Sequence, residues 1–283
     1  MRGATCPPDS THGKKLLGEI ESSVFDPPRT IMRRILLTIA YDGSAYNGWS
    51  TRGVGRGVRA VVADALEAAG FPDPVLESAS RTDAGVHALG MAAHFDVPDG
   101  GPDMADPRIV AAVNAKLPKD VRVVSAETKP AGFHARFDAV AKRYRYRIWN
   151  APVMNPLLVS HAWHVPRSLD VDAMSRAAAC FVGRHDFTAF TSRRKGVLGD
   201  PAREMFRCEV RRHGEEIAID LEASGFLYKM CRAVAGTLVL AGQGRISDNQ
   251  IRELLNGGSR HDAGMNAPAH GLVLLRVIYP DAQ

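Results

Sequence analysis

The segment from Lys142 to Trp149 constrains the fold more than any other part of the sequence. Between positions 143 and 148 its side chains alternate strictly, with Tyr144, Tyr146 and Ile148 at even positions and Arg143, Arg145 and Arg147 at odd ones. A period of two is that of a β-strand, because successive strand side chains point to opposite faces of a sheet. The alternation therefore predicts a strand with one apolar face and one cationic face.

The remaining sequence mixes strand-like and helix-like segments in a similar order in two halves. Alternating or continuously apolar runs predict strands at 35–41, 90–97, 121–126, 142–149, 204–212, 216–222 and 272–279. Helical spacing predicts helices at 57–69, 106–116, 170–182, 226–240 and 247–255, with Asp106 and Ser247 as N-caps. We predict an α+β fold: two similar halves with a continuous, mostly antiparallel sheet and helices on one face.

Residues 1–31 differ from the sequence that follows. They hold two Pro-Pro pairs and scattered Ser and Thr, and their positive and negative charges cancel, which fits neither a transit peptide nor a secretory signal. Met32 stands directly before a strand-like run. We expect residues 1–31 to be a disordered or non-native N-terminal extension, residues 32–130 an N-terminal α+β half, and residues 131–283 a C-terminal α+β half.

Composition excludes several classes of protein. With 45% apolar and 24% charged residues, the chain is neither a disordered nor a collagen-like protein. No stretch approaches the ~18 uncharged apolar residues that a membrane span needs. The net charge of +5 permits a polyanionic partner without requiring one. The cysteines form no CxxC pair, which favours reduced thiols in the cytoplasm, or in a mitochondrion if the source is eukaryotic: Cys6, Cys180, Cys208 and Cys231.

The loop SRTDAGVHA at 80–88 is the densest candidate for a functional site. It lies between predicted strands, and an arginine stands two residues before Asp83. A cation at Arg81 would lower the pKa of the Asp83 carboxyl and leave it ionised, able to act as a nucleophile. Gly85 would let the backbone approach a substrate closely. By composition alone, an ordinary turn in which Asp83 caps the next element is the more common structure.

This loop resembles the signature of the TruA-type tRNA pseudouridine synthases, a family with organellar relatives. Further segments match the family in the same order: YDG at 41–43 with GW at 48–49, NAKLP at 114–118, FHARF at 133–137, KRYRY at 142–146, GRHDFTAF at 183–190, GFLYKMCRAVAG at 225–236 and APAHGL at 267–272. The resemblance covers nearly all of residues 33–280. It implies a central RNA-binding cleft and isomerisation of uridine to pseudouridine in tRNA.

The resemblance also assigns roles to residues at the matching positions. Asp83 would be the catalytic carboxylate that acts at C1′ of the uridine. Tyr144 would stack on the target base and relay the C5 proton, although Tyr146 lies on the same strand face. Arg232 would pair with Asp83, as a cation on an apolar helix needs a partner. Arg81 would help extrude the nucleotide, and Leu272 would line the uracil site.

The family needs no cofactor and no catalytic metal. The spacing of His87 and His94 matches no metal motif either, so we assign no metal site. The resemblance implies a homodimer that binds tRNA, with the target uridine in the anticodon stem-loop.

Basic residues gather at three places that we expect to contact RNA phosphates. Arg143 and its neighbours line one strand face, and Arg193 and Arg194 stand in a predicted loop. The third group follows Trp49: Arg52, Arg56 and Arg59. Each group taken alone is more often a solvated surface.

Two departures from the family pattern leave alternatives open. The glutamines usual after the GW pair are replaced by arginines and glycines at 50–59, and Ser80 stands where many members have glycine. A synthase acting on other RNA, such as organellar mRNA, is one alternative. A non-catalytic RNA-binding protein or chaperone on the same scaffold is the other.

Overall fold

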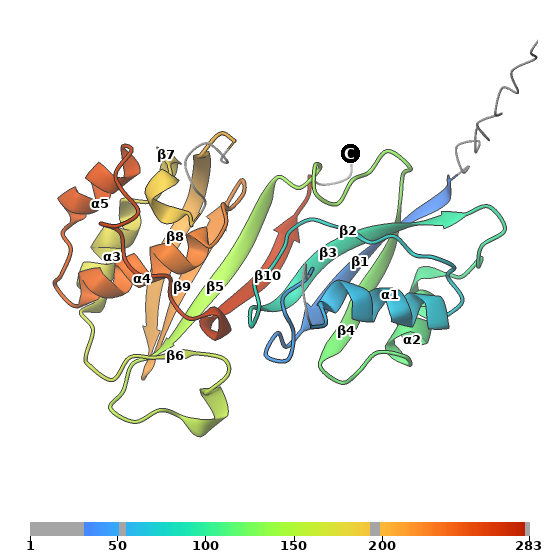
Figure 1. Ribbon diagram of the computed structural model, residues 1–283, viewed down its shortest axis with the longest axis horizontal. Coiled ribbons are helices and arrows are strands. Elements are labelled where there is room, and N and C mark those ends of the chain that lie inside the picture. The colour runs from blue at the N-terminus through green and yellow to red at the C-terminus, as the bar shows by residue number, and fades with distance from the viewer. Residues whose placement is uncertain (1–30, 51–54, 193–198, 281–283) are drawn as a thin grey trace, which may run out of the picture.

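Ten strands form one sheet among the residues that the computed structural model describes, which are 31–50, 55–192 and 199–280. The strand order is β4-β1-β3-β10-β5-β9-β8-β7, with β2 paired to β3 and β6 paired to β5. Most neighbouring strands are antiparallel; β10–β3 and β5–β6 are the parallel pairs. Figure 1 shows the sheet running the length of the molecule, with helices grouped over each half. The predicted fold class is confirmed.

The N-terminal half contributes one end of this sheet. Its elements in chain order are β1 (Ile31–Tyr41), α1 (Val58–Ala68), β2 (Glu77–Ser78), β3 (His87–Pro98), α2 (Asp106–Asn114) and β4 (Val121–Lys129). Helix α1 buries residues spaced as its sequence predicts: Val58, Val61, Val62, Ala65 and Leu66. This spacing places them on one side of the helix, against the sheet.

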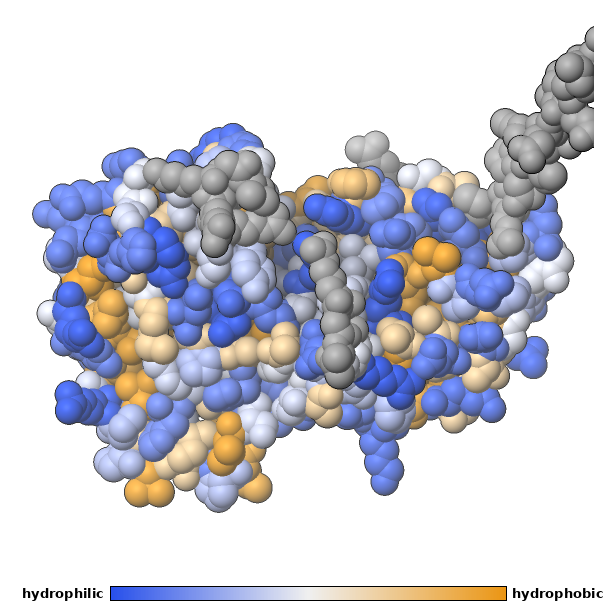
Figure 2. All heavy atoms as spheres, in the orientation of Figure 1, coloured by the Kyte–Doolittle hydropathy of each residue, from blue (hydrophilic) through white to orange (hydrophobic). Residues whose placement is uncertain are grey.

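The C-terminal half contributes the other end. Its elements are β5 (Ala141–Trp149), η1 (Pro156–Leu158), β6 (Trp163–His164), α3 (Val171–Ala179), β7 (Gly183–Asp186), η2 (Thr188–Phe190), β8 (Ala202–His213), β9 (Glu216–Ala223), α4 (Met230–Gly242), α5 (Asp248–Leu255), η3 (Ala269–Gly271) and β10 (Leu272–Ile278). The loop that carries η1 exposes several apolar side chains, which gather at the lower left of Figure 2: Val153, Leu157 and Val159.

Strand β10 joins the two halves. It pairs in parallel with β3, Val273 opposite His87, and antiparallel with β5, Leu272 opposite Tyr146. The last strand of the C-terminal half therefore completes the sheet beside the N-terminal half. The boundary at residue 130 stays a prediction, and residues 1–30 of the predicted extension at 1–31 lie outside the described residues, whereas Ile31 is the first residue of β1.

One face of the sheet carries the main core. Ile35, Leu37 and Ile39 of β1 pack in one buried cluster with residues of α1 and α4, and the same cluster takes in Tyr144 of β5. Leu36, on the other face of β1, belongs to a separate small cluster. The helices thus cover one face, and the arginines of β5 lie on the opposite one. No described helix is long and apolar enough to cross a membrane.

Some predicted boundaries are wrong for local reasons. Asp106 is not an N-cap: the helix begins at Asp106 itself, whose carboxylate accepts hydrogen bonds from Thr128 on β4. The helix predicted at 226–240 starts only at Met230, because Lys229 adopts a left-handed conformation with φ of 62°. Ser247 does cap α5, in a capping box with Gln250.

Candidate active site

The loop that connects β2 to β3 presents Asp83, and a turn from the end of β1 supports it. The amide of Trp49 donates to the carbonyl oxygen of Thr82 at 3.3 Å, and the amide of Gly85 donates to Tyr46 at 3.3 Å. Gly48 has a φ of +82°, and a Cβ there would lie 2.2 Å from the carbonyl oxygen of Thr82. The YDG…GW segment therefore positions the loop through direct backbone contact.

Asp83 forms an ion pair with Arg232, as predicted. Nη1 of Arg232 donates to Oδ2 of Asp83 at 3.0 Å, and its Nε donates to the carbonyl oxygen of Ala267 at 2.7 Å. The Asp83 side chain is 26% exposed and that of Arg232 is 15% exposed. One guanidinium thus holds, by a charge-assisted hydrogen bond, a carboxylate that a substrate can still reach.

The cation that forms an ion pair with Asp83 among the described residues is Arg232, not Arg81. The side chain of Arg81 is exposed, whereas Arg232 reaches Asp83 from the first turn of α4. The prediction that Arg81 holds the carboxyl ionised relied on proximity in the sequence. In the structure that place is taken by a residue of the other half.

Tyr144 lies beside this pair, on the helix-covered face of β5. Its side chain is buried, its ring meets Phe226 edge to face at 5.1 Å, and its hydroxyl lies 3.0 Å from Oγ of Ser80. Burial, followed by the nearby Cys231, raises the pKa of the Tyr144 phenol well above its usual value. The phenol therefore keeps its proton at neutral pH.

The structure separates Tyr144 from the alternative tyrosine. Tyr146 is fully buried, and its hydroxyl donates to the carbonyl oxygen of Pro268 at 2.8 Å. Tyr144 instead contacts the loop that carries Asp83. Of the two, Tyr144 is the tyrosine that the structure brings to the Asp83 loop, and its catalytic role stays a prediction.

The remaining predicted residues lie at different places. Leu272 is buried at the start of β10, opposite Tyr146. Arg143 lies on the uncovered face of the sheet in an ion pair with Glu222, so it is not brought together with Asp83. Arg193 and Arg194 lie outside the described residues. Roles in RNA binding for these residues stay predictions.

Sequence reasoning missed the hydroxyl groups that fix the loop. Besides the Ser80–Tyr144 contact, Oγ1 of Thr82 lies 2.8 Å from the hydroxyl of Tyr41. Ser80 therefore contacts the C-terminal half and Thr82 the N-terminal half, on either side of Arg81. The sequence feature that could have predicted these contacts is the pair of hydroxyl residues, Ser80 and Thr82, at alternate positions before Asp83.

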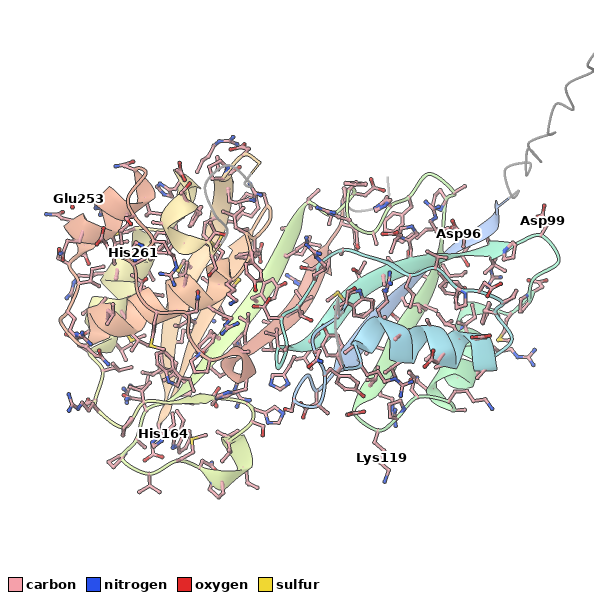
Figure 3. The ribbon with its side chains drawn as sticks, viewed as in Figure 1. Asp96, Asp99, Lys119, His164, Glu253 and His261 are labelled. Atoms are coloured by element: carbon pink, nitrogen blue, oxygen red, sulfur yellow. The ribbon has the colours of Figure 1, made fainter. Side chains whose placement is uncertain are left out.

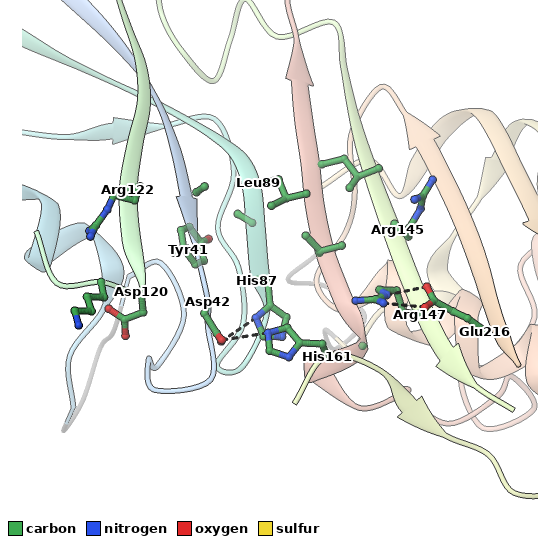
Figure 4. Close-up of a pocket in the computed structure, with 16 residues that line it drawn as sticks. Tyr41, Asp42, His87, Leu89, Asp120, Arg122, Arg145, Arg147, His161 and Glu216 are labelled. Atoms are coloured by element: carbon green, nitrogen blue, oxygen red, sulfur yellow. Dashed lines mark hydrogen bonds and ion pairs between the residues drawn. The ribbon is translucent and has the colours of Figure 1, made fainter. Parts of the chain in front are cut away.

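A groove of about 560 Å³ crosses the uncovered face of the sheet (Figure 4). Leu89 and Leu275 line it, together with Arg145 and Arg147. These arginines are already paired, Arg145 with Asp220 at 2.7 Å and Arg147 with Glu216 at 2.8 Å. The acids of β9 thus neutralise the cationic strand face that the sequence predicted.

Asp42, His87 and His161 cluster at one end of this groove. Oδ1 of Asp42 lies 3.1 Å from Nδ1 of His87, and its Oδ2 lies 3.1 Å from Nε2 of His161. The two imidazole rings stack at 4.7 Å with an interplanar angle of 19°. A metal ion lies near the plane of each imidazole that binds it, and these two stacked rings have nearly parallel planes that do not converge on one nearby point. The geometry favours a hydrogen-bonded contact between the halves.

Comparison with known proteins places the chain in a family. It is 41% identical over 252 residues to tRNA pseudouridine synthase A of Methylacidiphilum infernorum, an alignment that covers 87% of this chain and 96% of the relative. The chain belongs to the tRNA pseudouridine synthase A family. The enzyme of the same name from Geotalea daltonii is 40% identical, over 88% of this chain and 100% of the relative.

A third member, from Syntrophotalea carbinolica, is 43% identical, over 88% of this chain and 97% of the relative. The family model described as tRNA pseudouridine synthase matches residues 177–280, from α3 to β10. This match does not reach the Asp83 loop, whereas the alignments with the three synthase A members cover 87% to 88% of the chain.

Proposed function

We propose that this protein converts uridine to pseudouridine in tRNA, with Asp83 as the nucleophile. The observation that carries the proposal is the Asp83–Arg232 ion pair at 3.0 Å, assembled from both halves next to Tyr144. The names of the relatives support tRNA as the substrate. The anticodon stem-loop as the target, the cytoplasm as the location and a homodimer as the active form follow from the family resemblance.

The chemistry needs no redox step and no cofactor. A carboxylate oxygen of Asp83 bonds to C1′ as the N1–C1′ bond breaks, and the bonding electrons leave with the uracil. The base turns, C5 bonds to C1′, and the Asp83–C1′ bond breaks and restores the carboxylate. C5 then loses its proton, and N1 gains one from solvent.

Each neighbouring residue has a task in this scheme. Arg232 aims an oxygen of Asp83 through their ion pair, and Tyr144 stacks on the extruded base and takes the C5 proton. Leu272 lines the apolar wall of the base site. Arg81, exposed at the loop, contacts the RNA and offsets part of the cost of extruding the nucleotide.

Pseudouridine mapping on bulk tRNA tests the proposal. Wild-type protein should introduce pseudouridine in the anticodon stem-loop, and Asp83→Ala should introduce none while it still binds tRNA. The matched control is Asp99→Ala, since Asp99 is exposed in the turn after β3 and points away from the body (Figure 3). It should modify tRNA at the wild-type rate.

Other outcomes favour the alternatives. Turnover by Asp83→Ala would refute the nucleophile. If the wild-type protein binds tRNA but modifies only another RNA, that other RNA is the substrate. Binding without modification of any RNA, unchanged in Asp83→Ala, would identify a binding protein or chaperone.

A further inference from the structure

Ser80 and Tyr144 form a pair of hydroxyl groups at the edge of the candidate site. Their oxygen atoms lie 3.0 Å apart, and either can donate. Tyr144 is buried, whereas Ser80 is only half-buried and has solvent on one side. The hydrogen bond between them therefore connects the buried hydroxyl of Tyr144 to a group that solvent can reach.

The backbone holds Ser80 in this place without strain. Oγ of Ser78 donates to the carbonyl oxygen of Ser80 at 2.9 Å. In the part of the chain that the structure describes, the non-glycine residues with positive φ are Asp73 and Lys229, so Ser80 is not among them. A serine at a position where many members have glycine is thus accommodated by an ordinary backbone conformation.

Tyr144 alone is a poor acceptor for the C5 proton. Burial raises the pKa of its phenol well above the usual value, so the residue enters the reaction as a neutral phenol. A phenol oxygen that takes up a proton must release its own, since a doubly protonated phenol is far too acidic. The released proton needs an acceptor within hydrogen-bond distance.

We propose that Ser80 is the positioning residue that makes Tyr144 competent, by orienting the phenol and receiving its proton as the phenol oxygen takes the proton from C5. This inference rests on the proposed function. The C5–H bond breaks and its electrons return to the uracil ring. Tyr144 gains the C5 proton and passes its own to Oγ of Ser80, which gives its proton to water. Both residues end neutral, and one proton has moved from C5 to solvent.

A purely structural role for Ser80 predicts different behaviour. If Ser80 only satisfied a buried hydroxyl, its loss would lower stability and slow every step alike. If Ser80 instead acts in proton transfer, its loss makes removal of the C5 proton the slow step. The deuterium isotope effect at C5 separates the two, because it grows as that step becomes rate-limiting.

The test compares single-turnover rates on tRNA transcripts that carry uridine or 5-deuterouridine, using the full chain. Ser80→Ala and Ser80→Gly should each lower the rate about tenfold or more, with KM unchanged and a larger isotope effect. Ser80→Thr, which keeps a hydroxyl, should restore most of the rate. The matched control Ser125→Ala removes an exposed hydroxyl on β4 and should leave the rate and the isotope effect unchanged.

Several outcomes overturn the inference. Wild-type rate and isotope effect in both Ser80 variants would do so, and so would a slower rate with an unchanged isotope effect. Ser80→Gly keeps the test open if Ser80→Ala fails to fold, because many members of the family have glycine at this position. Failure of the proposed function is a separate result: the wild-type protein itself would then form no pseudouridine.

Discussion

Asp83 and Arg232 are 149 positions apart in the sequence yet share a hydrogen bond of 3.0 Å. Each reaches the other because its own backbone is fixed by a different part of the molecule. The Asp83 loop packs on the turn at Gly48, and Arg232 is held by the carbonyl oxygen of Ala267. The distance between the reacting groups therefore depends on residues that never touch substrate.

Gly48→Ala tests this dependence. A side chain there costs about 1–2 kcal/mol for its left-handed backbone and also collides with the carbonyl oxygen of Thr82, 2.2 Å away. We expect lower stability and a kcat reduced about 100-fold, because the loop is displaced. The matched control is Gly100→Ala, with a φ of +77° and nothing within 4 Å of the added carbon. It should lower Tm slightly and leave kcat unchanged.

Lys142 gives a prediction about pH. Burial, then the charges of Arg136 and Arg203, lower the pKa of its ammonium group from 10.5 to about 8. Between pH 8 and 10.5 the unfolded chain thus holds a proton that the folded chain has lost, and stability rises with pH. Lys142→Met should raise the free energy of unfolding at pH 7, by an amount that shrinks across this window.

Urea unfolding at several pH values measures the effect. Lys119→Met provides the control, since Lys119 is exposed and extends away from the body in Figure 3. Its effect on stability should not vary between pH 7 and 10. A constant difference between Lys142→Met and wild type across that range would contradict the prediction.

At the residue scale, the sequence predicted the Asp83–Arg232 pair from a simple physical demand. A cation on an apolar helix needs a partner, and Asp83 was the candidate carboxylate. It did not predict that Arg81 is exposed and that Arg232 alone among the described residues forms an ion pair with Asp83, nor that Ser80 contacts Tyr144. These contacts depend on the path of a short loop between the two halves. A local sequence pattern does not predict that path.

At the scale of elements, periodicity located most strands and helices but not their ends. Helix α4 begins four residues later than the apolar pattern indicates, because Lys229 breaks the helical backbone. Strand β7 was missed because its four residues, Gly183–Asp186, are polar and too short to show a period. The pairing between the acids of β9 and the arginines of β5 could not be predicted without the register of the two strands.

The close approach of β3 and β10 makes a prediction about the junction of the halves. A Cβ at Gly90 would lie 2.5 Å from the carbonyl oxygen of Leu275. Gly90→Ala should push the strands apart, lower stability by about 1–3 kcal/mol and reduce kcat, since Asp83 and Arg232 lie on opposite sides of the junction. Gly132→Ala, with nothing within 4 Å of the added carbon, is the control. Unchanged Tm and kcat in Gly90→Ala would refute the argument.

At the scale of the whole molecule, the two halves share one buried cluster and one sheet. We therefore expect a single cooperative unfolding transition rather than two. A variant with Trp149 and Trp163 replaced by Phe reports on the N-terminal half through the buried Trp49. Its fluorescence transition in urea should coincide with far-UV circular dichroism. Separate midpoints would show that the halves unfold independently.

The place of β10 has a consequence for how the protein is made. A ribosome delivers β3 and β5 long before β10, which follows every other described strand in the chain. Until then the edges of β3 and β5 that face β10 are unpaired. Unpaired strand edges are prone to aggregation. A nascent chain cannot assemble the Asp83–Arg232 pair in its final place before this strand emerges. A chain that lacks β10 would therefore leave the edges of β3 and β5 that face it unpaired.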